Sequence, residues 1–290
     1  MSYQVFSDSC CNLPGRMIDE LGVRIFSMVF TVDGVEYTSY LEDEEVDLKK
    51  FYDMMREGKV ITTSLPNLAD VERRLRAALD AGDDVLYLGF SSGLSGTFHA
   101  IEMLMNGLAS AYPERKVIAI DSLAASGGEG LLLWHAMQKV RHGATIDHVA
   151  EWLEDNKLKC AHWFTGDDLM YLFRGGRVSR TSAWAGTLLK IKPVMHVDDE
   201  GHLIPLEKVR GRKKAIASMV EHMARTVDEP AADQKVFVMH GDCQADAEYL
   251  VSRIEERFGC KDILVNYIDP VIGAHSGPGT LAVFFMGAQR

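Results

Sequence analysis

An α/β fold in two parts is predicted by three features of the sequence. In the first half, strands that are apolar throughout alternate with helical stretches, which is typical of a parallel sheet covered by helices on both faces. After residue 157 this rhythm changes. The length of 290 residues also matches about two domains of ordinary size. We therefore expect an N-terminal parallel-sheet α/β domain over residues 1–157 and a C-terminal α/β domain over residues 158–290.

The expected elements of the first half follow from apolar runs and the residues that bound them. Asn67 is a good helix cap, and residues 62–66 are expected to form a loop because the residue before Pro66 avoids the helical region. The predicted strands are 4–7, 23–32, 85–90 and 116–121, and the predicted helices are 47–57, 67–81, 98–112, 126–142 and 146–156.

The second half predicts another set of strands and helices. An acidic turn at residues 198–201 joins two apolar stretches, which indicates a hairpin. The predicted strands are 161–165, 193–197, 203–209, 235–239 and 263–268, and the predicted helices are 167–173, 211–227 and 245–258.

Composition excludes several classes of protein. With 31 basic and 42 acidic residues the net charge is −11, which disfavours non-specific nucleic-acid binding. Five cysteines without a CxxC pair indicate neither a disulfide framework nor a zinc knuckle, and they favour a reducing compartment. Neither a signal region nor an apolar run of membrane-spanning length is visible. We expect a cytoplasmic protein without a metal ion, cofactor or integral membrane segment.

A loop rich in serine and glycine, residues 91–97, lies between an apolar strand and a helix. The amides at a helix N-terminus are unpaired and carry partial positive charge, so they attract anions. Gly93 and Gly96 allow close approach to the backbone, and Ser95 is one of the hydroxyls at hand. We expect a carboxylate or phosphate site here, at the carboxyl end of a parallel strand. The alternative is that one serine only caps the helix.

Two further segments carry polar side chains. Residues 275–280, which begin with His275, form a predicted polar loop, and Thr63-Ser64 is a hydroxyl pair that alone is explained by turn chemistry. A second hypothesis is an acyl or phosphoryl transferase or hydrolase with Ser95 as nucleophile, His275 as base and Asp8 as orienting acid. The loop lacks the Gly-x-Ser-x-Gly spacing of a nucleophile elbow, which weakens that alternative.

Basic residues cluster after residue 173 in a chain that is acidic overall. They fit either ordinary solvation or a surface that docks an acidic partner or a phosphate, and an interaction protein that uses this face is a third hypothesis. The cluster comprises Arg174, Arg177, Arg180, Lys190, Lys192, Lys208, Arg210, Arg212, Lys213 and Lys214.

Taken together and in order, the motifs of the chain resemble those of the DegV family, which includes the FakB fatty-acid-binding subunits of bacterial fatty acid kinase. The resemblance spans nearly the whole chain. The motifs are Asp8-Ser9, Thr63-Ser64-x-Pro66, Ser91-Ser92-x-Leu94-Ser95-Gly96-Thr97, Asp121-Ser122 with Ala125-Ser126, Gly175-Gly176-Arg177-Val178-Ser179, Leu188-Leu189-x-Ile191-Lys192-Pro193, Val209-Arg210-Gly211 and His275-x-Gly277-Pro278-Gly279.

The resemblance implies an EDD-type N-terminal domain and a long-chain fatty acid buried in a tunnel at the interface of the two domains. Its carboxylate is expected to contact Thr63, Ser95, the Gly96 amide and His275. It further implies that a separate kinase subunit converts the bound acid to an acyl phosphate, with Arg177 and Arg210 facing that partner or its phosphate.

The chain departs from the family pattern in three places. Cys10, Leu65 and Phe98 stand where the family usually has Thr, Gln and Tyr. None of these changes removes an expected carboxylate contact. They leave the preferred acyl length and unsaturation open.

Overall fold

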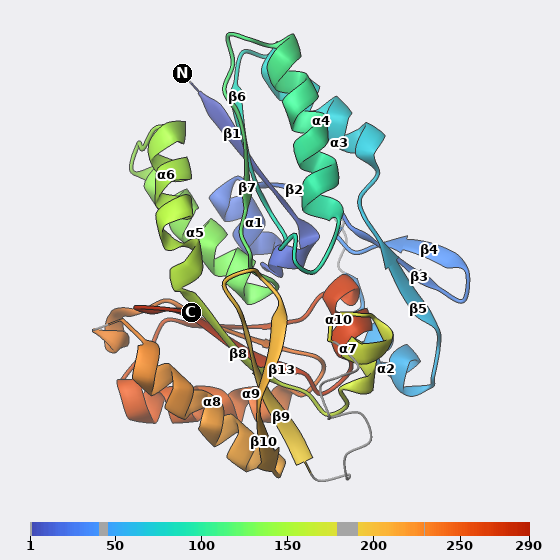
Figure 1. The fold of residues 1–290 in the computed structure, drawn as a ribbon, viewed down its shortest axis with the longest axis vertical. Helices are drawn as coiled ribbons and strands as arrows, with labels where there is room; N and C mark the ends of the chain where they lie inside the picture. The colour runs from blue at the N-terminus through green and yellow to red at the C-terminus, as the bar shows by residue number, and fades with distance from the viewer. Residues whose placement is uncertain (1, 41–45, 179–190, 229) are drawn as a thin grey trace.

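The computed structural model describes residues 2–40, 46–178, 191–228 and 230–290, and it contains two large sheets and a small one (Figure 1). The first large sheet has the order β2-β1-β6-β7 with all neighbours parallel, which confirms the parallel sheet predicted for the first half. Its strands are β1 (Tyr3–Asp8), β2 (Arg24–Phe26), β6 (Asp84–Gly89) and β7 (Val117–Asp121).

Strand β6 is buried on both faces, as its apolar sequence predicts. Val85 and Tyr87 belong to a core cluster with α3 (Leu68–Asp80) and α4 (Thr97–Ala111). Leu86 and Leu88 point the other way, into a cluster with α1 (Gly15–Leu21), α5 (Gly127–Arg141) and α6 (Ile146–Asn156). Alternate side chains of one strand thus hold two helical layers on the sheet.

The small sheet is antiparallel and pairs β3 with both β4 and β5. The prediction that residues 62–66 form a loop was wrong for residues 62–64, because they lie in β5, where Thr63 is opposite Phe30. The proline restriction acts only on Leu65, which follows the strand. The strands are β3 (Val29–Val32), β4 (Val35–Thr38) and β5 (Ile61–Ser64). Helix α2 (Leu48–Arg56) lies between β4 and β5 in the sequence and shares a core cluster with β3.

The second large sheet has the order β10-β9-β8-β13-β11-β12, and only β11 and β12 are parallel neighbours within it. The predicted hairpin is confirmed as β9 paired antiparallel with β10. The central strand β13 was not among the predicted elements. The strands are β8 (Cys160–Thr165), β9 (Ile191–Val197), β10 (Leu203–Arg210), β11 (Val236–His240), β12 (Ile263–Tyr267) and β13 (Leu281–Met286).

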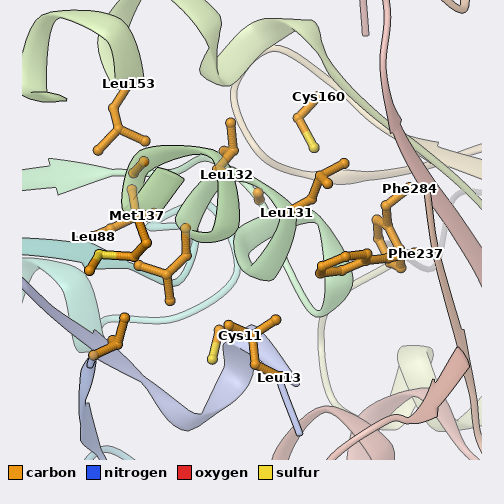
Figure 2. Packing of buried hydrophobic residues seen from close by; sticks show 14 of the residues in the cluster. Cys11, Leu13, Leu88, Leu131, Leu132, Met137, Leu153, Cys160, Phe237 and Phe284 are labelled. Atoms are coloured by element: carbon orange, nitrogen blue, oxygen red, sulfur yellow. The ribbon is translucent and has the colours of Figure 1, made fainter. Parts of the chain in front are cut away.

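Two layers of helix cover this second sheet. Helices α8 (Arg212–Thr226) and α9 (Gln244–Phe258) pack on one face, and α5 packs on the other (Figure 1). Leu131 and Leu132 of α5 share a core cluster with Leu88 of the first sheet and Phe237 and Phe284 of the second (Figure 2). The two sheets are therefore joined through one buried helix, although α5 lies before the predicted domain boundary at residue 157.

Two short helices complete the part of the fold that positions the site, α7 (Met170–Arg174) and α10 (Pro270–Ser276). His275 was predicted in a loop, which was wrong, because it lies in the last turn of α10. Asp269 caps that helix by accepting from the amides of Val271 and Ile272, and Pro270 occupies its first turn. No helix of the described residues is long and apolar enough to span a membrane.

Candidate functional site

A cavity of about 400 Å³ lies between the first half of the chain and the second sheet. Its size is within the usual range for small-molecule sites. Most of its wall is apolar and comes from both halves: Met28, Leu65, Phe90, Leu94, Ala125, Phe164, Leu172, Val197, Leu203, Ile268, Val271, Ile272, Ala282 and Phe284. The polar side chains on the wall include Thr63, Ser95 and His275, so the structure brings these three predicted residues to one cavity.

Thr63 and His275 are in direct contact, 212 positions apart in the sequence. Thr63 Oγ1 lies 2.7 Å from His275 Nε2. Burial lowers the pKa of His275 to about 4, with a smaller contribution from the Arg177 charge, so the imidazole is neutral near pH 7. If Nε2 carries the proton it donates to Thr63, whose own hydroxyl hydrogen is then free to donate to an anion.

Glycines allow this contact by letting backbone approach side chains closely. A Cβ on Gly175 would lie 2.4 Å from His275 Nδ1, so only glycine permits α7 to end beside the imidazole. A Cβ on Gly277 would lie 2.4 Å from the Tyr171 ring, and its φ of +84° also favours glycine. The Gly-Gly and His-x-Gly motifs are therefore explained by the packing of α7 against α10.

Ser95 and Gly96 precede the first turn of α4, and both line the cavity together with Thr97. Ser95 Oγ lies 2.9 Å from Thr97 Oγ1, and the Thr97 amide donates to Ser95 Oγ at 3.2 Å. Ser91 Oγ donates to the Gly201 carbonyl at 3.0 Å, which ties this loop to the β9–β10 turn. The predicted anion site is thus formed by a loop that the second half of the chain holds in place.

Asp8, considered above as an orienting acid, has a different set of partners. It accepts hydrogen bonds from Tyr87 Oη at 2.8 Å, the Phe90 amide at 3.0 Å and the Cys10 amide at 3.1 Å. Burial raises its pKa, while these donors oppose that shift. Asp8 therefore fixes the start of the loop after β6, and within the described residues it makes no hydrogen bond to His275.

Arg177 is half-buried and lines the cavity, at a place that its sequence position did not reveal. Its Nε donates to the Leu94 carbonyl at 3.1 Å and its Nη1 donates to the Gly175 carbonyl. Burial lowers its pKa. No carboxylate pairs with this guanidinium among the described residues, so the cavity wall carries a positive charge suited to an anionic ligand.

Arg210 lies elsewhere, exposed at the end of β10 opposite Ile191. Other members of the basic cluster are neutralised: Lys192 pairs with Asp167 at 2.6 Å, and Arg212 pairs with Asp246 at 2.8 Å. Arg180 and Lys190, together with the motif residues Ser179, Leu188 and Leu189, lie outside the described residues. The partner-facing roles of Arg177 and Arg210 stay predictions.

Sequence reasoning missed one polar residue of the cavity, His162 in β8. It follows the strand alternation that also places Phe164 on this face, and that alternation was the available signal. Across the described residues, no group of three or more His, Cys, Asp or Glu side chains could hold a metal ion.

The fold and the cavity define a class: α/β proteins with two large sheets, a largely apolar cavity between their halves and a polar cluster of Thr, Ser, His and Arg on its wall. A family described as "Uncharacterised protein, DegV family" matches residues 2–288. A DegV domain-containing protein of Clostridium perfringens is 39% identical over 288 residues, covering 99% of this chain and 98% of that protein. The chain belongs to the DegV family.

Solved structures show the same architecture. A DegV lipid-binding protein from Thermotoga maritima is 28% identical, covers 100% of both chains and has a TM-score of 0.86. A DegV family protein from Thermus thermophilus, whose structure is described as showing fatty acid binding, is 29% identical over 99% of this chain and 100% of that chain, also with a TM-score of 0.86. The fatty-acid-binding DegV of Bacillus subtilis is 27% identical over 99% of both chains with a TM-score of 0.81.

Proposed function

We propose that this protein binds a long-chain fatty acid in the cavity, with the carboxylate held by Thr63, Ser95, the Gly96 amide and His275. The observation that carries the proposal is the Thr63–His275 contact on the wall of a largely apolar cavity. Solved relatives that bind fatty acids have this fold, and Arg177 adds a positive charge at the same wall.

The energetics assign different tasks to the two ends of the ligand. A buried methylene is worth about 0.8 kcal/mol, so about fifteen of them contribute roughly 12 kcal/mol before ordering costs. A helix N-terminus adds only about 0.3–2 kcal/mol to the binding of a carboxylate. The acyl chain therefore supplies most of the affinity, whereas the hydroxyls, the imidazole and the amide determine which way the acid lies.

We further propose that the protein is not itself an enzyme but presents the carboxylate to a fatty acid kinase catalytic subunit, which forms the acyl phosphate. A second pocket of about 450 Å³ adjoins the polar cluster, and Thr63, His275 and Arg177 line both pockets. Arg174 also lines this second pocket. A carboxylate bound by Thr63 would therefore have a further pocket next to it. The five cysteines are free, which fits a cytoplasmic location.

The hydrolase or transferase alternative gains little from the geometry. Ser95 Oγ pairs with Thr97, His275 Nε2 pairs with Thr63, and Asp8 is bonded elsewhere. A serine nucleophile needs a base within hydrogen-bond reach and a third group that orients the base. A covalent acyl or phosphoryl adduct on Ser95 would restore that alternative.

The proposal is tested on purified protein by mass spectrometry of solvent-extracted lipid, followed by phosphorylation of the bound acid with ATP and a fatty acid kinase subunit. A co-purified fatty acid is expected, and Ser95→Ala is expected to slow phosphorylation far more than it lowers the melting temperature. Ser92→Ala is the matched control, because Ser92 lies in the same loop but is not among the residues that line the cavity. Absence of lipid together with no uptake of added oleate or palmitate would refute fatty acid binding.

A further inference from the structure

The guanidinium of Arg290 ties the turn between β9 and β10 to the first half of the chain. Its Nη1 donates to the Leu123 carbonyl at 2.7 Å and to the Asp198 carbonyl at 2.9 Å. Leu123 follows β7, and Asp198 begins the turn after β9. Nη2 and Nε donate to the carbonyls of Lys157 at 2.7 Å and Cys160 at 3.2 Å. The rigid fork of donors on one arginine therefore fixes the base of the turn.

This turn packs directly on the loop that precedes α4. The Gly201 amide donates to the Asp198 carbonyl at 3.0 Å, and the Gly201 carbonyl accepts from Ser91 Oγ at 3.0 Å. A Cβ on Gly201 would lie only 2.1 Å from Ser91 Oγ. A Cβ on Gly93 would lie 2.6 Å from the Glu200 carbonyl oxygen. Because two glycines let the backbones touch, a shift of the turn would displace the loop.

Ser91 sets the shape of the loop that carries Ser95. The Ser91 carbonyl accepts from the amides of Leu94 at 3.1 Å and Ser95 at 3.2 Å, and Ser91 Oγ accepts from the Gly93 amide at 3.2 Å. Ser91 is fully buried and, like Arg290, is not among the residues that line the cavity. A continuous run of hydrogen bonds thus connects Arg290 with Ser95 through the β9–β10 turn and Ser91.

We propose that Arg290 is a positioning residue for the ligand carboxylate: by fixing the β9–β10 turn, it holds the Ser95 hydroxyl where that hydroxyl donates to the carboxylate. A binding site is precise when the groups that contact the ligand are held by supporting hydrogen bonds. The inference rests on the proposed fatty acid binding and names a residue outside the cavity on which the carboxylate contacts depend. It requires no covalent step.

The test compares the dissociation constants of octadecanoic acid and its methyl ester, measured by displacement of a fluorescent fatty acid. The ester keeps the acyl chain but not the charge, so the ratio of the two constants, the acid preference, reports the carboxylate contacts. Arg290→Ala is expected to reduce the acid preference about 3- to 10-fold, whereas a merely loosened fold would weaken acid and ester alike. An acid preference within about twofold of the wild type would overturn the proposal. Arg115→Ala is the matched control, because Arg115 donates to the Gly82 carbonyl at the opposite end of β6.

Two further variants test the route from Arg290 to Ser95. Ser91→Ala removes the hydroxyl that joins the loop to the turn and is expected to reduce the acid preference by a similar factor, so it decides the question if Arg290→Ala does not fold. In a Ser95→Ala background, either variant is expected to change the acid preference by less than about twofold, because the hydroxyl to be positioned is absent. An undiminished effect in that background would overturn the assignment to Ser95. A wild-type protein that does not bind octadecanoic acid, or does not prefer it to the ester, would instead refute the proposed function.

Discussion

Replacing Thr63 by valine tests the contact on which the proposed site depends. Valine keeps the β-branched shape and suits strand β5, but it removes Oγ1, which lies 2.7 Å from His275 Nε2. His275 is largely buried, and the variant leaves its Nε2 without that partner. The substitution therefore perturbs both the empty protein and the complex, and the two effects are separable.

The expected magnitudes follow from the two hydrogen bonds lost. An unpaired buried imidazole nitrogen is expected to cost about 1–3 kcal/mol in the free energy of unfolding. Loss of a hydroxyl that donates to a carboxylate is expected to cost about 1.5–3 kcal/mol in binding, which is roughly a 10- to 150-fold higher dissociation constant. The acyl chain keeps its contacts, so binding is weakened and not abolished.

Thr62→Val is the matched control, because Thr62 is the adjacent, exposed residue of the same strand and is not among the residues that line the main cavity. Urea unfolding of the ligand-free proteins and displacement of a fluorescent fatty acid at about pH 7, where His275 is neutral, give the two quantities. If Thr63→Val folds normally and binds octadecanoic acid within twofold of the Thr62→Val protein, the assignment of Thr63 to the carboxylate is refuted.

Two predictions concern stability. Burial and nearby carboxylates, Asp8 among them, raise the pKa of Glu129 well above its ordinary value of 4.5. The folded protein therefore keeps a proton that the unfolded chain releases, and its free energy of unfolding falls as pH rises above 4.5. In urea unfolding, Glu129→Gln is expected to be more stable than the wild type by a margin that grows from about pH 5 to about pH 8, and a constant or shrinking margin would contradict this. The Arg290 guanidinium donates to the carbonyls of Cys160, Leu123, Asp198 and Lys157. Arg290→Ala is therefore expected to lower the free energy of unfolding by about 2–4 kcal/mol. A loss below about 0.5 kcal/mol would show that these hydrogen bonds do not stabilise the fold.

Local sequence patterns correctly predicted several elements whose formation depends mainly on their own residues. The apolar run of β6, the Asn67 cap of α3 and the hairpin of β9 and β10 were all predicted and are confirmed. The strand errors fall where pairing partners are distant, whereas the helix that holds His275 was missed although Asp269 and Pro270 mark its start locally. Strand β5 needs β3 to form, and β13 lies at the centre of a sheet whose other strands come from separate parts of the chain.

The sequence by itself determined the α/β class, the polar loop before α4 and, through an ordered set of motifs, the family. The tertiary structure alone decided that Thr63 and His275 touch and that Arg177 and His162 line the cavity. The physical reason is that spacing along a chain governs helix caps, strand alternation and loop chemistry. A cavity is instead the space left between packed elements, and its polar lining depends on sheet order and on the close approaches that residues such as Gly175 permit.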